Sequence, residues 1–138
     1  MDTLTIESAP SITLSSGLNV VNFSSPHPFN FESGEILSGC SPERSRALSM
    51  GSDDVTKSRT LPNGKVVELV TKRFTMTEEI LRELYLLQNS VNVDVILVPF
   101  PTLQGLQASG ELAMFSKVAT IFVVNRETKA ISNSKFCQ

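Results

Sequence analysis

Two pairs of cationic side chains are spaced to bind an anion. Arg44 and Arg46 lie in a segment that can start a short helix, where guanidinium groups can hold a phosphate through paired hydrogen bonds. Arg126 and Lys129 follow Asn125 in a polar turn, and two cations this close can contact a phosphate and its neighbouring hydroxyl groups. Both pairs are candidates for ligand contact, although an ordinary solvated surface has the same composition.

A third candidate site is the tetrapeptide Pro99-Phe100-Pro101-Thr102, between an expected strand and an expected helix. Binding crevices in open α/β arrangements lie at such strand ends, and the free N–H groups of a helix start favour anions. Phe100 could stack on a base there, or it could cap the core. With the cations, Phe100 and Thr102 predict a site for a small phosphorylated nucleotide.

Candidate catalytic groups are few. His27, the only histidine, could act as a general base, or it could be a turn residue bonded to nearby backbone. Glu78 and Glu79 could act as acid and base, although acids at a helix start also stabilise the helix dipole. The sequence contains no phosphate-binding loop, no Gly-x-Ser-x-Gly, no His-Glu-x-x-His and no glycine-rich dinucleotide motif. We therefore expect a binding protein without catalytic residues.

The sequence contains few cysteine and histidine side chains, which are the kinds that usually bind zinc. Cys40 and Cys137 are the only cysteines, and with one histidine they cannot complete a four-ligand zinc site by themselves. Two cysteines are also fewer than a disulfide framework normally has. We expect two free thiols, no metal site and no cofactor.

Composition narrows the class of protein further. Hydrophobic residues make up 41% of the 138 residues and charged residues 19%, which favours one globular domain. A net charge of −2 supplies no field to hold DNA. The longest apolar run, residues 95–100, is far short of the roughly 20 residues that a membrane span needs. Because a secretory signal pattern is also missing, we expect a cytoplasmic protein.

The helices and strands expected from the sequence, which must position the candidate residues, indicate an α+β fold. Apolar residues at helical spacing over about residues 76–90, after a capping box that begins at Thr75, predict one long amphipathic helix. Short helices are expected after Ser41 and from Pro101 to Gly110. Strands are expected at residues 18–23, 29–31, 35–37, 59–61, 65–70, 95–98, 118–124 and 129–132. Short turns join several of these strands, which predicts a mainly antiparallel sheet.

The domain boundaries follow from the change in pattern at Gly17. Residues 1–16 are rich in Ser and Thr with isolated apolar positions, which predicts a flexible N-terminal extension. Residues 17–138 are expected to form the single α+β domain.

Three segments together resemble a known family. The run Val20-Val21-Asn22-Phe23-Ser24-Ser25-Pro26-His27-Pro28 resembles the opening of small phage-encoded β-rich proteins. Two later runs, Val95-Ile96-Leu97-Val98 and Phe122-Val123-Val124-Asn125-Arg126, resemble their later strands in order and spacing. We identify this group with the phage Thoeris anti-defence sponges. The resemblance implies a viral protein that binds a cyclic ADP-ribose-type immune signal between subunits and withholds it from the effector.

Three functions stay open at this point. Sequestration of a small cyclic nucleotide is the one that the resemblance implies, and the residues alone also allow a nucleotide-processing enzyme or a protein-interaction adaptor with no small ligand. We also expect a homodimer, or a hexamer built from dimers. Phe29 and Phe31 would lie on one face of a small hairpin and be exposed unless a helix or another subunit covers them.

Overall fold

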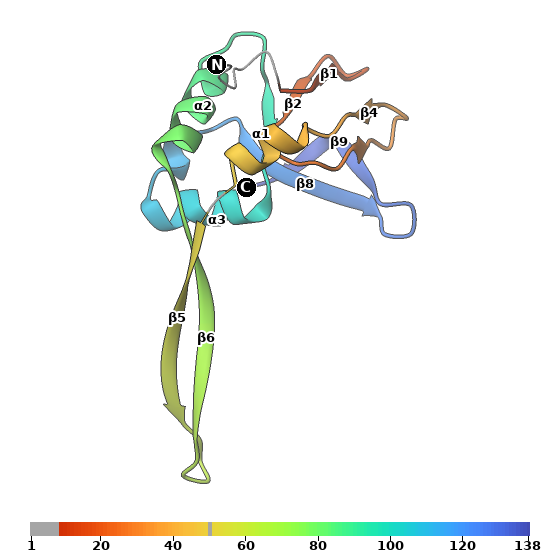
Figure 1. The fold of residues 1–138 in the computed structure, drawn as a ribbon. Helices are drawn as coiled ribbons and strands as arrows, with labels where there is room; N and C mark the ends of the chain where they lie inside the picture. Colours follow the sequence, from red (N-terminus) through yellow and green to blue (C-terminus); the bar gives the residue numbers. More distant parts are fainter. Residues whose placement is uncertain (1–8, 50) are drawn as a thin grey trace.

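The computed structural model describes residues 9–49 and 51–138. Helices and strands alternate irregularly along the chain, as expected of an α+β protein (Figure 1). In chain order the elements are β1 (Ser11–Thr13), β2 (Asn19–Asn22), β3 (Phe29–Asn30), β4 (Ile36–Leu37), α1 (Pro42–Ala47), β5 (Gly51–Thr60), β6 (Val66–Thr75), α2 (Glu78–Gln88), β7 (Val95–Leu97), α3 (Phe100–Ser109), the 3₁₀ helix η2 (Leu112–Met114), β8 (Val118–Asn125) and β9 (Ala130–Cys137).

The main sheet has five strands in the order β1-β2-β7-β8-β9. The central strands β2, β7 and β8 run parallel, while β1 and β9 are antiparallel to their neighbours. The α+β class is confirmed, but the expectation of a mainly antiparallel main sheet is wrong, because this sheet is mixed. Parallel neighbours need long crossovers, and the connection from β2 to β7 contains α1, the β5–β6 hairpin and α2.

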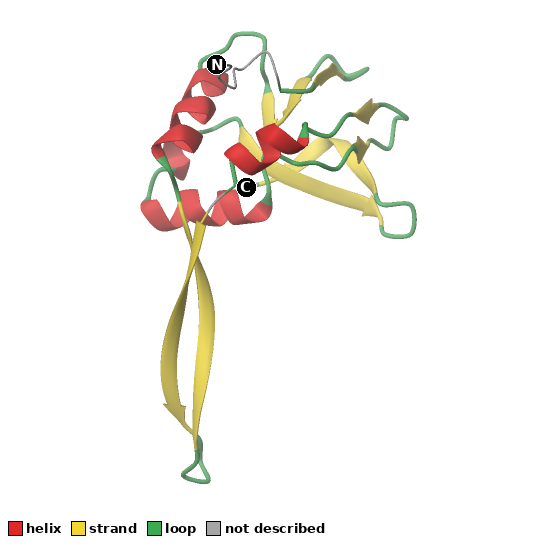
Figure 2. Ribbon diagram, viewed as in Figure 1, coloured by secondary structure: helices red, strands yellow, loops and turns green. Residues whose placement is uncertain are grey.

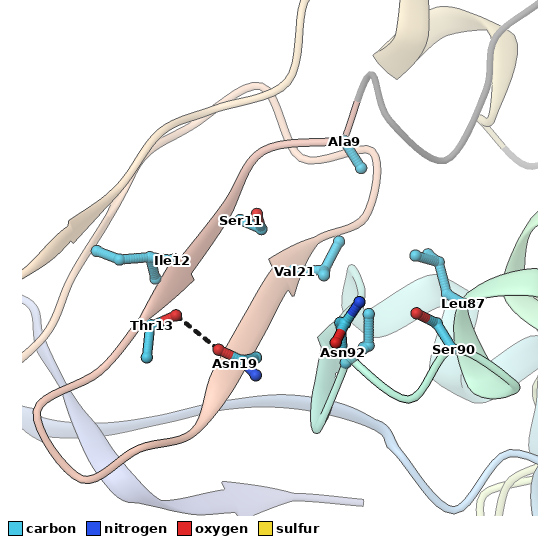
Figure 3. Close-up of a pocket in the computed structure, with 10 residues that line it drawn as sticks. Ala9, Ser11, Ile12, Thr13, Asn19, Val21, Leu87, Ser90 and Asn92 are labelled. Atoms are coloured by element: carbon cyan, nitrogen blue, oxygen red, sulfur yellow. Dashed lines mark hydrogen bonds between the residues drawn. The ribbon is translucent and has the colours of Figure 1, made fainter.

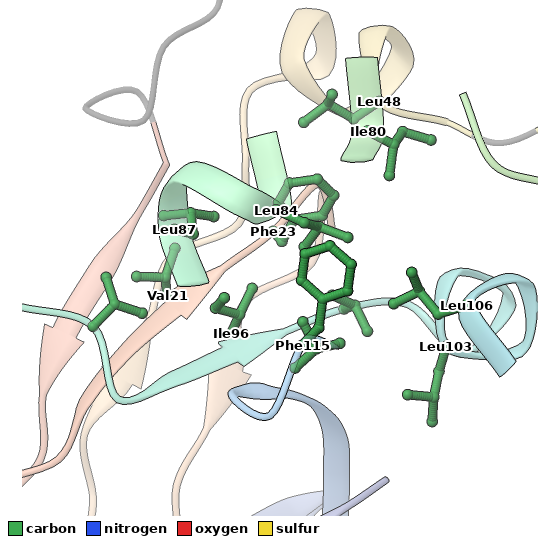
Figure 4. Packing of buried hydrophobic residues seen from close by; sticks show 13 residues of the cluster. Val21, Phe23, Leu48, Ile80, Leu84, Leu87, Ile96, Leu103, Leu106 and Phe115 are labelled. Atoms are coloured by element: carbon green, nitrogen blue, oxygen red, sulfur yellow. The ribbon is translucent and has the colours of Figure 1, made fainter. Parts of the chain in front are cut away.

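Two buried clusters lie on the two faces of this sheet. Val21 and Ile96 belong to the cluster under the helices, with Phe23, Leu84 and Phe115 (Figure 4). The neighbouring residues along the same strands point to the opposite face, because side chains alternate along a strand. That second cluster consists of Leu14, Val20, Phe31, Leu37, Leu97 and Ile131.

The hairpin β3–β4 covers the second cluster. Phe31 is buried in the cluster and Phe29 packs against it. The two phenylalanines from which we expected self-association are therefore covered within the chain, and an interface must use other residues.

Helix α2 differs from expectation at both of its ends. Helix α2 is eleven residues long, shorter than the predicted 76–90, and its cap is Thr77, whose Oγ1 accepts a hydrogen bond from the Ile80 N–H at 3.2 Å. Thr75 instead ends β6. The predicted caps at Ser41 and Gly110 are confirmed: the Ser41 hydroxyl accepts from the N–H of residue 44, and Gly110 is left-handed with φ 76°.

The β5–β6 hairpin, which we call the arm (residues 51–75), projects far from the body of the molecule (Figure 2). Its strands pair along ten residues each, from Gly51 opposite Thr75 to Thr60 opposite Val66. The sequence predicted strands only at 59–61 and 65–70, because β5 contains a single large apolar residue, Val55. The turn was placed correctly: Gly64 has φ 84°.

The start of the chain is described from Ala9, so residues 1–8 of the predicted extension lie outside the described part, as does Met50. Residues 11–13 form β1 on the edge of the main sheet, and Leu14 is buried. None of the helices described is long and apolar enough to cross a membrane.

Candidate functional site

A crevice lies where the carboxyl ends of the parallel strands β2 and β7 meet. Its cavity measures about 260 Å³ and lies between the strand ends, α1, the base of the arm and the start of α3. The lining residues are Ser24, Pro26, Ser45, Leu48, Ser49, Phe74, Pro99, Pro101 and Thr102. Thr102, a predicted site residue, is therefore part of this crevice.

A second cavity of about 390 Å³ adjoins the crevice, since Pro99 lines both. Its other lining residues are Ser25, Phe29, Val98, Phe100, Thr120 and Ile121. Phe100, another of the predicted site residues, lines this second cavity and is 61% exposed. Every lining residue of the two cavities is uncharged, so the surfaces suit an apolar ring with hydroxyl contacts better than a phosphate.

The start of α3 offers an anion few donors. Pro101 has no N–H, and the N–H groups of Thr102 and Leu103 both donate to the Pro99 carbonyl, at 3.0 and 3.3 Å. The expected anion site at this helix start is therefore weaker than at a start with free amides.

Asn22 shapes the loop that walls the crevice. Its side-chain Nδ2 donates to the carbonyl oxygens of Ser25 at 3.2 Å and Ser38 at 3.0 Å, and its Oδ1 accepts from the Ser25 N–H. The residue is fully buried, and a buried amide is retained only when it is hydrogen-bonded. Sequence reasoning missed Asn22, although a polar residue within the apolar run 20–23 was the available signal.

Gly39 packs against the same loop. A Cβ atom added there would lie 2.2 Å from the carbonyl oxygen of Pro26, so only glycine fits without a shift of the backbone. Ser24 in the loop has φ 63°, a left-handed conformation that is rare outside glycine. The loop conformation is thus fixed by specific local contacts.

Arg44 lies in the core and does not line the crevice. Its Nη1 is 3.3 Å from Oε1 of Glu83, which joins α1 to α2, and its guanidinium carbon lies 5.6 Å from the centre of the Phe23 ring. Both charged side chains are buried. Arg46, its predicted companion, is exposed on α1, so the structure does not bring the two guanidinium groups together.

Asn125, Arg126 and Lys129 lie exposed at the turn between β8 and β9. Oδ1 of Asn125 accepts the N–H groups of Glu127 and Thr128, at 2.9 and 3.1 Å, which gives this asparagine a role in the turn itself. None of the three lines the crevice or the cavity beside it. The predicted site residues are therefore divided among the crevice, the cavity beside it, the core, the surface of α1 and this turn.

The other reactive groups are dispersed. Burial raises the pKa of the Cys40 thiol, against an opposing effect of the nearby Arg44, and its Sγ donates to the Asn22 carbonyl at 3.2 Å. Cys137 is exposed, and both cysteines are free thiols. Among the residues described, no group of three or more His, Cys, Asp or Glu side chains could hold a metal.

A cavity of about 530 Å³ lies between the β1–β2 edge and the end of α2 (Figure 3). It includes none of the predicted site residues, and no lining side chain is ionisable. Its lining residues are Ala9, Ser11, Ile12, Thr13, Asn19, Val21, Leu87, Ser90, Asn92 and Val93. Nothing in this lining indicates a reaction or a charged ligand.

The arm is the second candidate site. Val66, Leu69 and Val70 of β6 are 63%, 45% and 59% exposed, and the two strands form a sheet of their own. Cross-strand pairs share a face, which places Val66, Val70 and Phe74 on one face of the hairpin and Leu69 on the other. Both faces therefore present apolar side chains to solvent.

No family model, curated protein or solved structure matches the chain. The function is therefore argued from the residues themselves, on the basis of two features. The arm presents apolar side chains and unpaired strand edges, and the crevice and the cavity beside it present hydroxyl groups and one exposed aromatic ring.

Proposed function

We propose that the chain is a protein-interaction subunit that binds its partner through the arm. The observation that carries this proposal is the arm itself: two ten-residue strands, paired only with each other and exposed on both faces. This corresponds to the adaptor among the three functions considered from the sequence.

The physics of a two-stranded hairpin supports a covering partner. An isolated hairpin is marginally stable in water, and three or more strands with an apolar face are needed for independent stability. An exposed edge strand also presents a row of free N–H and C=O groups that templates pairing with another chain. Half of the ten residues of β6 are apolar, namely Val66, Val67, Leu69, Val70 and Phe74. Full burial of one such side chain contributes roughly 1.5–3 kcal/mol.

A photo-reactive amino acid at Val70 tests this proposal. We expect irradiation of cells that produce this variant to give a covalent adduct between the arm and another polypeptide chain. The matched control carries the same group at Tyr85, a similarly exposed position on α2, and should give little adduct. Equal adduct from both positions, or none from Val70, would rule the arm out as the binding element.

We propose small-ligand binding in the crevice as a second candidate function. It is supported by one observation, that two residues chosen from the sequence, Phe100 and Thr102, line adjoining cavities. The ligand would be the nucleotide implied by the resemblance to the Thoeris sponges, held intact, with its base against Phe100 and its hydroxyl groups near Thr102. Because the lining is uncharged, its phosphates would have to extend toward solvent.

Recovery of bound ligand tests this second candidate. The purified protein is mixed with a panel of cyclic nucleotides, separated from free ligand, denatured by heat, and the released material analysed. Intact release from wild type that is lost in Phe100→Ala supports the crevice, and a converted product indicates an enzyme. Phe122→Ala, which removes another exposed ring from β8, serves as the control and should retain ligand.

A further inference from the structure

We propose that the partner of the arm is a second copy of this chain, with β6 paired antiparallel to β6 of that copy about a two-fold axis at Val70. The inference rests on the proposed function, since it names the partner of the same arm. The hydrogen-bond pattern of the hairpin and the order of charges along β6 both lead to it.

The hairpin fixes which backbone groups of β6 are available. The N–H of Leu61 donates to the carbonyl of Lys65 at 2.7 Å, so this pair is hydrogen-bonded across the hairpin. In an antiparallel pair, residues alternate between hydrogen-bonded and non-hydrogen-bonded positions. The even-numbered residues of β6, from Val66 to Phe74, therefore direct their N–H and C=O groups to the outer edge.

This alternation limits the registers that a two-fold pairing can adopt. The outward N–H and C=O groups of one β6 strand must face the outward groups of the other. The two-fold axis therefore has to pass between one residue and the same residue of the other copy, and not between two consecutive residues of the strand. An axis at Glu68 or at Lys72 would place a like charge against itself. An axis at Leu69 would place Glu68 opposite Val70, and an axis at Thr71 would place Lys72 opposite Val70. In both registers a charged side chain faces an apolar one and has no opposite charge across the ladder.

An axis at Val70 matches both the charges and the apolar residues. Glu68 then lies opposite Lys72 of the other copy, and the symmetry repeats this pair. Val66 lies opposite Phe74, and Val70 lies opposite Val70 of the other copy, so apolar pairs alternate with the Glu68–Lys72 pairs on one face of the joined strands. Opposite charges and apolar pairs directly across a ladder are the arrangements that stabilise antiparallel strands.

The outer edge of β5 is much less suited to such pairing. It carries Asp53 and Asp54 toward the body and Lys57 and Arg59 toward the tip, with Val55 as its only large apolar residue. Charged side chains on an edge strand discourage pairing with other chains. The arm thus has one protected edge and one apolar edge.

Pairing through β6 makes a four-stranded sheet from two hairpins, which removes the apolar edge from solvent. The register brings Val66 of each copy to the base of the other arm, next to Phe74.

Charge exchange at the two paired positions tests the register. In Glu68→Lys, the introduced lysine of each copy would face Lys72 of the other, and in Lys72→Glu two glutamates would face each other. Each variant alone should dimerise at least about tenfold more weakly than wild type, because both symmetry-related pairs become repulsive. An equimolar mixture should dimerise again, since every pair between the two variants is then of opposite charge. Sedimentation equilibrium reports the mass relative to the 15.1 kDa chain.

The mixing experiment distinguishes a loss of pairing between two copies from a loss of stability within one hairpin. Lys72 also forms an ion pair with Asp54 at 3.1 Å, so Lys72→Glu alone could weaken its own arm. Rescue by the Glu68→Lys chain cannot arise from that intramolecular loss. Lys57→Glu on β5 and Glu127→Lys at the β8–β9 turn are matched controls that should dimerise like wild type.

The outcomes separate this inference from the proposed function. Restoration in the mixture, but not in either variant alone, supports the β6 register. A wild-type chain that stays at 15.1 kDa at high micromolar concentration, or a mixture that is not restored, overturns it. If adducts at Val70 then contain a different protein, the proposed function stands without the second copy, and if Val70 gives no adduct the proposed function fails as well.

Discussion

The guanidinium Nη1 of Arg44 lies 3.3 Å from Oε1 of Glu83, and both side chains are buried between α1 and α2. Removing the carboxylate of such a buried pair takes away the opposite charge at short range and costs about 3–5 kcal/mol. We predict that Glu83→Ala lowers the free energy of unfolding in urea by about that amount. Glu79→Ala, an exposed position one turn earlier, should change it by less than about 1 kcal/mol. Equal effects of the two substitutions would contradict the assignment of Arg44 to the core.

Gly39 provides a local test of the crevice loop. We predict that Gly39→Ala destabilises the fold by about 1–3 kcal/mol, because the new methyl group would lie 2.2 Å from the Pro26 carbonyl oxygen. Gly51→Ala is the matched control, since a Cβ at that position meets no atom within 4 Å. Thermal unfolding of both variants measures the difference, and the prediction fails if Gly39→Ala melts at the wild-type temperature.

The two thiols should differ strongly in reactivity. Burial raises the pKa of Cys40, so at neutral pH it stays a protonated thiol that solvent reagents do not reach, while Cys137 is exposed. Iodoacetamide followed by mass spectrometry should modify one site rapidly in the native protein and both after denaturation. In Cys137→Ser the native protein should show no rapid modification, and fast labelling of that variant would contradict the burial of Cys40.

Glu35 should make stability depend on acid pH. Hydrogen bonds from the Ser33 hydroxyl and from the Ser15 N–H lower the pKa of this carboxyl below its ordinary value. The ionised form is therefore favoured by folding, and this contribution is present above the unfolded pKa and is lost as the pH falls through the folded pKa. The melting temperatures of wild type and Glu35→Gln should differ near neutral pH and converge in acid. A difference independent of pH would refute the effect.

Local signals in the sequence were sufficient for the short-range features. Ser41 before Pro42, and Gly110 after an apolar helix, identified a helix start and a helix end because caps depend on a few neighbouring residues. The tight turn at Gly64 was identified for the same reason.

Features set by distant contacts were not recoverable in this way. The parallel pairing of β2 with β7 joins residues far apart in the chain, and no local pattern encodes it. Residues 51–58 of strand β5 were missed because most of them are polar, and the conformation of this strand depends on pairing with β6. Arg44 was predicted as a ligand contact, because its partner Glu83 lies on another helix and nothing near Arg44 in the sequence indicates their pairing.

The candidate site shows the same division. Phe100 and Thr102 were predicted because a proline-rich strand end precedes a helix, which is a relationship between adjacent residues, and each of them lines a cavity. Asn22 was missed because its importance comes from three carbonyl groups in two separate loops. The apolar edge of the arm was not predicted, because the sequence did not indicate how long the two strands of the arm are.

Residue-resolved hydrogen exchange by nuclear magnetic resonance tests the central claim most directly, because the claim concerns single amides of β6. As the protein concentration is raised, the outward amides of Glu68, Val70 and Lys72 should change from fast to slow exchange, since a second β6 strand then accepts their hydrogen bonds. The outward amides of β5, such as those of Thr56 and Ser58, should stay fast in the same samples. If the β6 amides instead exchange as fast as those of β5 at every concentration, no second copy covers this edge.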